Sequence, residues 1–318
     1  MRLLRLVPEN TKIPFMRGRF FGVMLSAVLS TASLIAFFYP GLNYTIDFRG
    51  GVLVELRSPE PLDSGKLRAS FGTLGLGEVS VQSLGIAAAI AGSDHDALVK
   101  LTGEAQSETI RKLIQPLIDK DFPGTEIRSL DVVGAKVSSD LTWAGIYATI
   151  GALGGILLWI WFRFDWQYGV GLVATLILDA TKTIGFYALF QLPFDQDALA
   201  AILILIGFSV TDKVVVYDRI RENLRKYKTM PLRQVIDLSI NQTLSRTVAT
   251  SLTVLLSILP LAIMGIGSVQ FFAITMVFGI FVGTLSSIGI AAPILLFLGE
   301  KRLRRIETGS SATAAAAQ

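Results

Sequence analysis

The sequence predicts a polytopic α-helical membrane protein with six transmembrane helices and one α+β domain between the first two helices. Hydrophobic residues make up 52% of its 318 residues and charged residues only 17%, and the mean hydropathy is +0.57. This composition is too apolar for a soluble globular protein. Segments long enough to cross about 30 Å of hydrocarbon as helices are Phe20–Tyr39, Leu141–Phe162, Tyr168–Phe190, Ala198–Tyr217, Thr247–Gly265 and Gln270–Leu298.

The basic residues predict which side of the membrane each loop occupies. Lys and Arg gather in residues 1–19, at Arg163, between Arg219 and Arg233, and in residues 301–305, whereas loops 191–197 and 265–268 contain none. The positive-inside rule therefore places both termini in the cytoplasm. We expect a cytoplasmic N-terminus (1–19), transmembrane helix 1 (20–39), an outer domain (40–140), helices 2–6 (141–298) with an amphipathic cytoplasmic segment (218–246), and a basic, then disordered tail (299–318). Basic residues in short loops without interleaved aromatics do not indicate nucleic-acid binding.

Residues 40–140 predict the single domain outside the membrane. Alternating apolar residues and turn signals indicate strands at 51–57, 78–85, 96–103 and 125–134, and helices at 61–75 and 107–124. The order β-α-β-β-α-β is that of the ferredoxin-like split motif. The sole histidine, His95, has no second His or Cys to complete a metal site, so we expect neither a metal nor another cofactor.

Four ionisable residues interrupt the apolar segments. A charge at the centre of a membrane helix costs about 2.5–3.5 kcal/mol on insertion scales, so such residues usually have a function. Asp179 and Lys182 are three positions apart, which predicts a pair on one helix face. Asp212 and Lys213 are adjacent and point about 100° apart. We expect Lys213 to extend its ammonium toward the cytoplasmic interface.

Asp212 then requires a proton or a partner from another helix. We expect that partner to be Arg246, at the start of the next segment. Thr250 lies one turn from Arg246, and Ser209 lies one turn from Asp212. Their hydroxyls are suited to hold water for a proton relay, or to bond to backbone carbonyls. The alternative is that the charge pair only joins two helices, although such pairs contribute little net stability.

An enzymatic function has little support. Asp179 and Asp212 on neighbouring helices suggest an intramembrane aspartyl protease, whose two carboxylates must share a proton. Nearby Lys182, Lys213 and Arg246 argue against it, because a base beside each aspartate keeps it ionised. No G-x-x-x-x-G-K-[ST] loop for nucleotide phosphates is present. We therefore expect a transporter component or a passive scaffold, with no catalytic residue.

Three stretches together resemble the SecD/SecF family of bacterial protein-export membrane proteins, and its SecF members in particular. They are NYTIDFRGG (43–51), GFSVTDKVVVYDRIREN (207–223) and NQTLSRTVATSLT (241–253). The six-helix layout with one large outer loop matches as well. Phe208 and Thr211 stand where the family usually has Tyr and Asn, and Leu178 where it often has His. A relay role for His or Asn at these positions is therefore not carried over.

The resemblance implies half of a transporter of the resistance-nodulation-division superfamily, in the bacterial inner membrane with its domain in the periplasm. The implied partners are SecD as the other half, the SecYEG translocon, YajC, unfolded preproteins and the lipid bilayer. The family uses the proton-motive force, or sodium in some members, to promote export. Its ion-path positions match Asp212 and Arg246, with Thr250 beside them. The alternatives are a transporter half that exports lipids or small molecules, and a passive scaffold.

The stretch NYTIDFRGG predicts how the chain enters the outer domain. We expect an extended strand fixed against the start of the domain, with Asp47, Gly50 and Gly51 as its motif residues. The glycine pair predicts a tight bend or bulge at a point where a side chain would clash.

Overall fold

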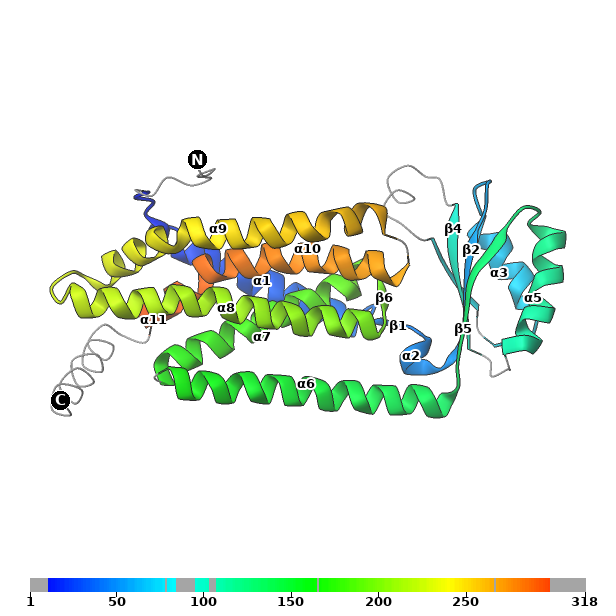
Figure 1. Cartoon of the computed structure of the whole chain (residues 1–318), viewed down its shortest axis with the longest axis horizontal. Coiled ribbons are helices and arrows are strands. Elements are labelled where there is room, and N and C mark those ends of the chain that lie inside the picture. The colour runs from blue at the N-terminus through cyan, green and yellow to red at the C-terminus, as the bar shows by residue number, and fades with distance from the viewer. Residues whose placement is uncertain are drawn as a thin grey trace.

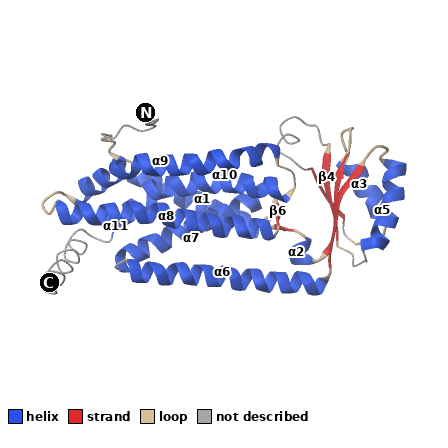
Figure 2. Ribbon diagram, in the orientation of Figure 1, coloured by secondary structure: helices blue, strands red, loops and turns tan. Residues whose placement is uncertain are grey.

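The computed structural model describes residues 11–77, 79–83, 95–102, 107–164, 166–265 and 267–297. A long helical bundle lies beside a separate α/β domain, and all the larger strands belong to that domain (Figures 1 and 2). We call the end of the bundle nearest the domain the domain end and the opposite end the far end. The beginning of the first long helix, drawn in blue, and α11 (Ala292–Phe297) both lie toward the far end. The predicted disordered tail falls outside the described residues.

Among the described residues, six helical spans are long and apolar enough to cross a membrane, as the sequence predicts. The first five spans are single continuous helices: α1 (Arg19–Phe38), α6 (Ala135–Arg163), α7 (Trp166–Phe190), α8 (Gln196–Lys226) and α9 (Leu232–Met264). The last span consists of α10 (Ser268–Ser286), a π-helical turn (Ser287–Ala291) and α11 (Ala292–Phe297). The segment 218–246 is not a separate element, because α8 and α9 continue into it and form a hairpin with a short turn.

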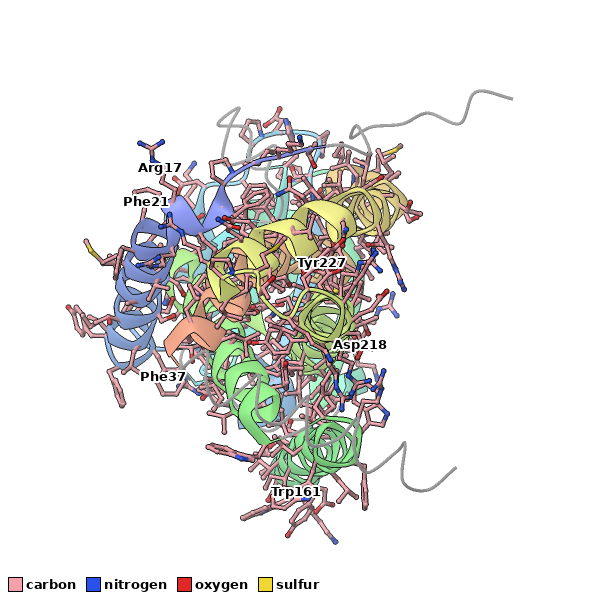
Figure 3. All side chains as sticks on the ribbon, turned by 90° about the vertical axis from the view of Figure 1, so that its left-hand side faces the viewer. Arg17, Phe21, Phe37, Trp161, Asp218 and Tyr227 are labelled. Atoms are coloured by element: carbon pink, nitrogen blue, oxygen red, sulfur yellow. The ribbon has the colours of Figure 1, made fainter. Side chains whose placement is uncertain are left out.

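The bundle carries apolar side chains on its outside. Seen from the far end, Phe21, Phe37 and Trp161 point away from the helices (Figure 3). Phe21 is 74% exposed and Trp161 is 83% exposed. Large apolar residues at such exposure are unfavourable in water but suit a hydrocarbon solvent. The exterior therefore agrees with the membrane protein that the composition predicts.

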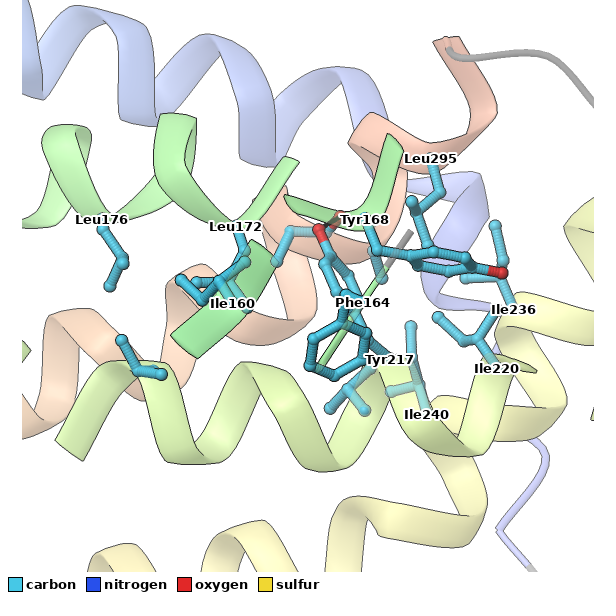
Figure 4. Close-up of a cluster of buried hydrophobic side chains, with 14 of the residues drawn as sticks. Ile160, Phe164, Tyr168, Leu172, Leu176, Tyr217, Ile220, Ile236, Ile240 and Leu295 are labelled. Carbon is cyan, nitrogen blue, oxygen red and sulfur yellow. Dashed lines mark hydrogen bonds between the residues drawn. The ribbon is translucent and has the colours of Figure 1, made fainter. Parts of the chain in front are cut away.

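Part of the apolar core of the bundle lies near the far end. Tyr168 and Tyr217 lie edge to face there, with ring centroids 5.8 Å apart, among aliphatic side chains of α6–α9 and α11 (Figure 4). The Tyr217 hydroxyl donates a hydrogen bond to the Ala291 carbonyl (2.8 Å), which ties α8 to the π-helical turn. The chain before α1 joins this end, because the Ile13 amide donates to the Asn241 side chain of α9 (3.0 Å).

The α/β domain has the predicted element order. Its elements are β2 (Gly51–Arg57), α3 (Ser64–Gly72), β3 (Val79–Ser83), β4 (Asp96–Leu101), α5 (Ser107–Asp121) and β5 (Glu126–Val133). The sheet is antiparallel with strand order β3-β4-β2-β5, a ferredoxin-like arrangement. Alternate residues of β2, beginning at Val52, are buried under α3 and α5, which cover the sheet face turned away from the bundle (Figure 1). Strand β5 leads directly into α6.

The segment 43–51 is not a continuous extended strand. A short strand, β1 (Asn43–Tyr44), pairs in parallel with β6 (Pro193–Phe194) from the connection between α7 and α8. One helical turn, α2 (Ile46–Arg49), follows and packs along α6. The expected bend is present, because Gly50 and Gly51 have φ values of 73° and 125°. The prediction failed at 46–49 because the segment is fixed to the bundle as well as to the domain.

Gly51→Ala should destabilise the domain strongly. A Cβ at this position would lie 2.2 Å from the Leu101 carbonyl oxygen, and φ is in a region that L-residues avoid. We expect a loss of more than about 2 kcal/mol in the free energy of unfolding. Chemical unfolding of the full chain in detergent measures it. Gly72→Ala is the control, since no atom lies within 4 Å of its added Cβ, and equal stability of the two variants would contradict the assignment.

Candidate functional site in the helical bundle

The Asp179 carboxylate on α7 lies at the centre of a cluster of buried polar side chains. It accepts hydrogen bonds from Lys182 Nζ on the same helix (3.3 Å) and from Lys213 Nζ on α8 (2.7 Å). The Ser209 hydroxyl on α8 donates a third bond (2.8 Å). All four side chains are buried, and Lys213 has no exposed surface. The predicted Asp179–Lys182 pair is therefore present, as part of a larger cluster that joins two helices.

The expectation that Lys213 extends toward the interface is wrong. Its ammonium turns inward, contacts Ser209 and Asp179, and is completely buried. The reason is that α8 presents Ser209 and Lys213, one turn apart, to α7. A buried ammonium without a counter-charge is costly, whereas the Asp179 carboxylate supplies both charge and acceptor oxygens.

Asp212 lies on another face of α8 and contacts α9. It is 8% exposed, and its Oδ1 accepts a hydrogen bond from the Thr247 hydroxyl (2.7 Å). Its Oδ2 is buried and has no hydrogen-bond partner among the described residues. Buried carboxylate oxygens are normally paired, so this one is an exception that calls for a function or an additional partner.

The expected Asp212–Arg246 pair is not formed. Thr247, the next residue, occupies the position facing Asp212, and consecutive helical residues point about 100° apart. Arg246 is exposed and makes no ion pair with any described carboxylate. Thr250 donates to the carbonyls of Arg246 and Thr247 in its own helix, so it does not contact Asp212 either.

Arg246 lies in an open groove on the side of α8 and α9. The groove encloses about 670 Å³ and is lined by Trp159, Thr211, Val214, Val215, Asp218, Arg219, Glu222, Gln242, Thr243 and Arg246. Trp159 comes from α6, so three helices border it. Asp218 and Glu222 also line the groove, but neither forms an ion pair with Arg246 among the described residues. A basic side chain on the flank of a membrane helix suits a surface that faces another polar protein.

Thr247 is the site residue that the sequence reasoning missed. The signal was a hydroxyl every four residues along α9, at Ser239, Thr243 and Thr247, all of which are buried. This spacing places them on one helix face. A buried hydroxyl stripe on a membrane helix predicts the face that meets a polar group, and Arg246 lies beside that stripe.

A second polar cluster lies at the domain end, where α8 begins. Asp195 Oδ1 accepts a hydrogen bond from the Ala198 amide (2.7 Å), and Asp47 Oδ2 accepts one from the Gln196 amide (3.2 Å). Burial, with the nearby negative charges of Asp197 and Asp47, raises the pKa of Asp195 to about 7. The backbone hydrogen bond from Ala198 opposes this rise. Asp47, Gly50 and Gly51 therefore lie at the junction with the domain, far from Asp212.

Comparison with known proteins gives consistent matches. The family described as protein export membrane protein SecD/SecF, C-terminal, matches residues 114–301. A protein translocase subunit SecF from Rhodobacter capsulatus is 38% identical over 309 residues, which are 94% of this chain and 92% of the relative. One from Cereibacter sphaeroides is 39% identical over 303 residues, covering 94% of this chain and 93% of the relative.

Two solved structures are similar over almost the whole chain. The crystal structure of SecDF, a translocon-associated membrane protein from Thermus thermophilus, matches with a TM-score of 0.82 and 31% identity, covering 92% of this chain. A SecDF crystal structure in a super-membrane-facing form matches with a TM-score of 0.61 and 30% identity, covering 97% of this chain. This chain spans only 39% and 41% of those longer chains.

Asp179→Leu should destabilise the bundle, because it leaves two buried ammonium groups without their shared carboxylate. Removing one partner of a buried ion pair typically costs about 3–5 kcal/mol. Unfolding of the purified protein in detergent measures the change. Arg246→Ala is the control and should stay within about 0.5 kcal/mol, since Arg246 is exposed. Similar losses in both variants would contradict the central position of Asp179.

Acidification should stabilise the folded protein through Asp195. Its folded pKa is about 7, well above the ordinary value of 3.8. The folded state therefore binds the proton more tightly, and this stabilisation is fully present at low pH and lost as the pH rises through about 7. Asp195→Asn keeps an acceptor oxygen for the Ala198 amide but cannot titrate. Melting temperatures between about pH 5 and pH 8 should fall less in the variant than in wild type; parallel curves would contradict the assignment.

Proposed function

Because this chain belongs to the SecD/SecF family of protein-export membrane proteins, we propose that it couples proton flow across the bacterial inner membrane to the export of preproteins. It acts as a transporter subunit, with no catalytic residue of its own. The chain corresponds to the SecF-type half, since it covers nearly the full length of SecF relatives but 39% of a SecDF chain.

The observation that carries the proton-coupling proposal is the Asp212 carboxylate. It is buried among membrane-spanning helices, and one of its oxygens has no partner among the described residues. A carboxylate in this state has two accessible forms: an anion that accepts the hydrogen bond of Thr247, or a neutral acid whose burial costs less because it carries no charge. Exchange between these forms is what a proton-driven device requires.

A proton suits this site better than a sodium ion. Both Asp179 oxygens already accept hydrogen bonds from ammonium groups. Asp212 offers one free oxygen, and Thr247 is the only side chain among the described residues that bonds to it. Hard metal cations need several oxygen ligands at once. A proton needs only one lone pair, which Asp212 Oδ2 provides.

The groove beside α8 and α9 supports a second six-helix protein as the partner, and we assign SecD to that role. Arg246 and Thr211 line this groove, so a partner helix placed there would supply Arg246 with polar contacts inside the membrane. Basic residues gather at the far end, at Arg163 and within residues 219–228. They favour a cytoplasmic location for that end. The α/β domain then faces the periplasm, where preproteins leave the SecYEG translocon; YajC remains an expected accessory partner.

Asp212→Asn should abolish the gradient-dependent part of export while the protein remains folded and bound to its partner. The amide keeps the size of the side chain and an acceptor for Thr247, but it cannot take up a proton. Export into oriented vesicles with and without an imposed proton gradient measures the effect. We expect the increment due to the gradient to fall by about tenfold or more, which corresponds to at least 1.4 kcal/mol.

Asp119→Asn, an exposed carboxylate of α5 in the domain, is the matched control and should behave as wild type. Full gradient-stimulated export by Asp212→Asn would contradict proton coupling at this residue. It would favour the passive scaffold, for which the membrane charges are only structural. If a sodium gradient, imposed in place of the proton gradient, stimulated wild-type export equally well, the proposal that the proton is the coupling ion would be contradicted.

A further inference from the structure

We propose that residues 43–51, which we call the strap, transmit movement of α8 to the central strand of the periplasmic domain, and that Asp47 is the positioning residue of this link. The inference rests on the proposed function, since it supplies the mechanical connection between the membrane site and the domain. It adds a role for a segment that lies about 24 Å from Asp212 by helical rise.

The first part of the strap is fixed to the connection between α7 and α8. Strand β1 pairs with β6, and the Thr45 amide and hydroxyl both donate to the Phe194 carbonyl (3.0 and 3.2 Å). The Asn43 side chain donates to the Gln191 carbonyl (3.1 Å), and the Gln191 side chain donates to the Gly41 carbonyl (2.9 Å). These reciprocal bonds hold the two segments in one register.

Aromatic packing stiffens the same joint. Tyr44, Phe48 and Phe194 form a three-ring cluster with centroid separations of 5.7–6.0 Å. Tyr187 of α7 meets Phe194 edge to face at 5.4 Å. Aromatic pairs of this kind stabilise a contact beyond the area they bury. The strap is therefore attached by side-chain packing as well as by backbone pairing.

Asp47 joins the strap directly to α8. Its Oδ2 accepts the hydrogen bond of the Gln196 amide, the first residue of that helix (3.2 Å). Because the first amides of a helix lack intrahelical partners, a carboxylate there is favoured both as an acceptor and by the helix dipole. Helix α8 is continuous from Gln196 to Lys226 and carries Asp212 near its middle. A displacement at Asp212 therefore reaches the strap along one uninterrupted helix.

The strap leaves no slack where it enters the domain. Gly50 and Gly51 lie so close to the neighbouring strands that an added Cβ would lie 3.3 Å from the Val133 carbonyl oxygen and 2.2 Å from that of Leu101. Gly51 is already the first residue of β2, which lies between β4 and β5. Movement of α2 thus reaches the central strand of the sheet through two residues.

A substitution at Asp47 and an insertion before Gly50, each made in the full chain bound to its partners, test the link. Asp47→Ala removes the acceptor for the Gln196 amide, whereas Asp47→Asn retains an acceptor oxygen. A flexible Gly-Gly insertion between Arg49 and Gly50 retains the pairing of β1 with β6 and the Asp47 contact with α8. It introduces slack and removes only the hydrogen bond from the Gly50 amide to the Ile46 carbonyl. Asp119→Ala is the matched control. We expect Asp47→Ala and the insertion each to lower the gradient-dependent increment of export about tenfold, corresponding to about 1.4 kcal/mol, with export in the absence of a gradient unchanged.

A distance measurement separates transmission from a merely structural role. The chain contains no cysteine, so spin labels on Lys112→Cys in α5 and Met264→Cys at the domain end of α9 report only the chosen pair; both sites are exposed. We expect the distance distribution to change when the gradient is imposed on wild type, and to stay constant in the insertion variant. Asp47→Asn should retain most of the gradient-dependent increment of export and most of the change in distance, in contrast to Asp47→Ala.

The outcomes distinguish this inference from the proposed function. If wild type responds to the gradient and Asp212→Asn does not, but Asp47→Ala and the insertion respond as wild type, the strap proposal is wrong and proton coupling stands. Equal loss of export with and without the gradient, accompanied by a lower melting temperature, would also overturn it, because Asp47 would then serve stability alone. If wild-type export shows no gradient dependence, the proposed function itself fails.

Discussion

The arrangement of the bundle depends on one carboxylate that compensates two ammonium groups in a hydrocarbon environment. Asp179 accepts hydrogen bonds from both Lys182 and Lys213. All three side chains are buried, so water does not solvate their charges while α7 and α8 stay packed. Breaking such a contact exposes an unpaired charge to low dielectric, which costs more than the pair itself contributes. The cluster therefore fixes the rotation of α8 against α7.

That rotation decides where Asp212 points. With Ser209 and Lys213 turned toward α7, Asp212 must face α9, where Thr247 can satisfy only one of its oxygens. Helix α10 also approaches α8 closely, since Gly279 lies directly against the Leu205 side chain. The incompletely satisfied carboxylate is thus a consequence of satisfying the lysines.

The sequence predicts the elements much better than it predicts their contacts. Hydropathy and alternation are local, so the six spans and the β-α-β-β-α-β order could be predicted, as could Asp179–Lys182 within one helix. Whether Thr247 or Arg246 faces Asp212 depends on a rotation of about 100°, the angle between consecutive helical residues. Only the packing between helices decides that rotation. The pairing of β1 with β6 joins two-residue strands from distant parts of the chain, too short to leave any periodic signal.

Magnitudes indicate which of the two buried carboxylates can move. One proton crossing about 100 mV releases about 2.3 kcal/mol. A hydrogen bond to a charged group contributes about 1.5–3 kcal/mol, so the energy released by a single proton is of the same size as the hydrogen bond between Asp212 and Thr247. Removing a partner from the Asp179 cluster costs about 3–5 kcal/mol, which a single proton does not supply. In the proton-driven cycle that we propose, Asp179 is therefore the fixed point of α8 and Asp212 is the group that changes state. A helix held at one point and continuous to Gln196 can pass a small tilt on to Asp47.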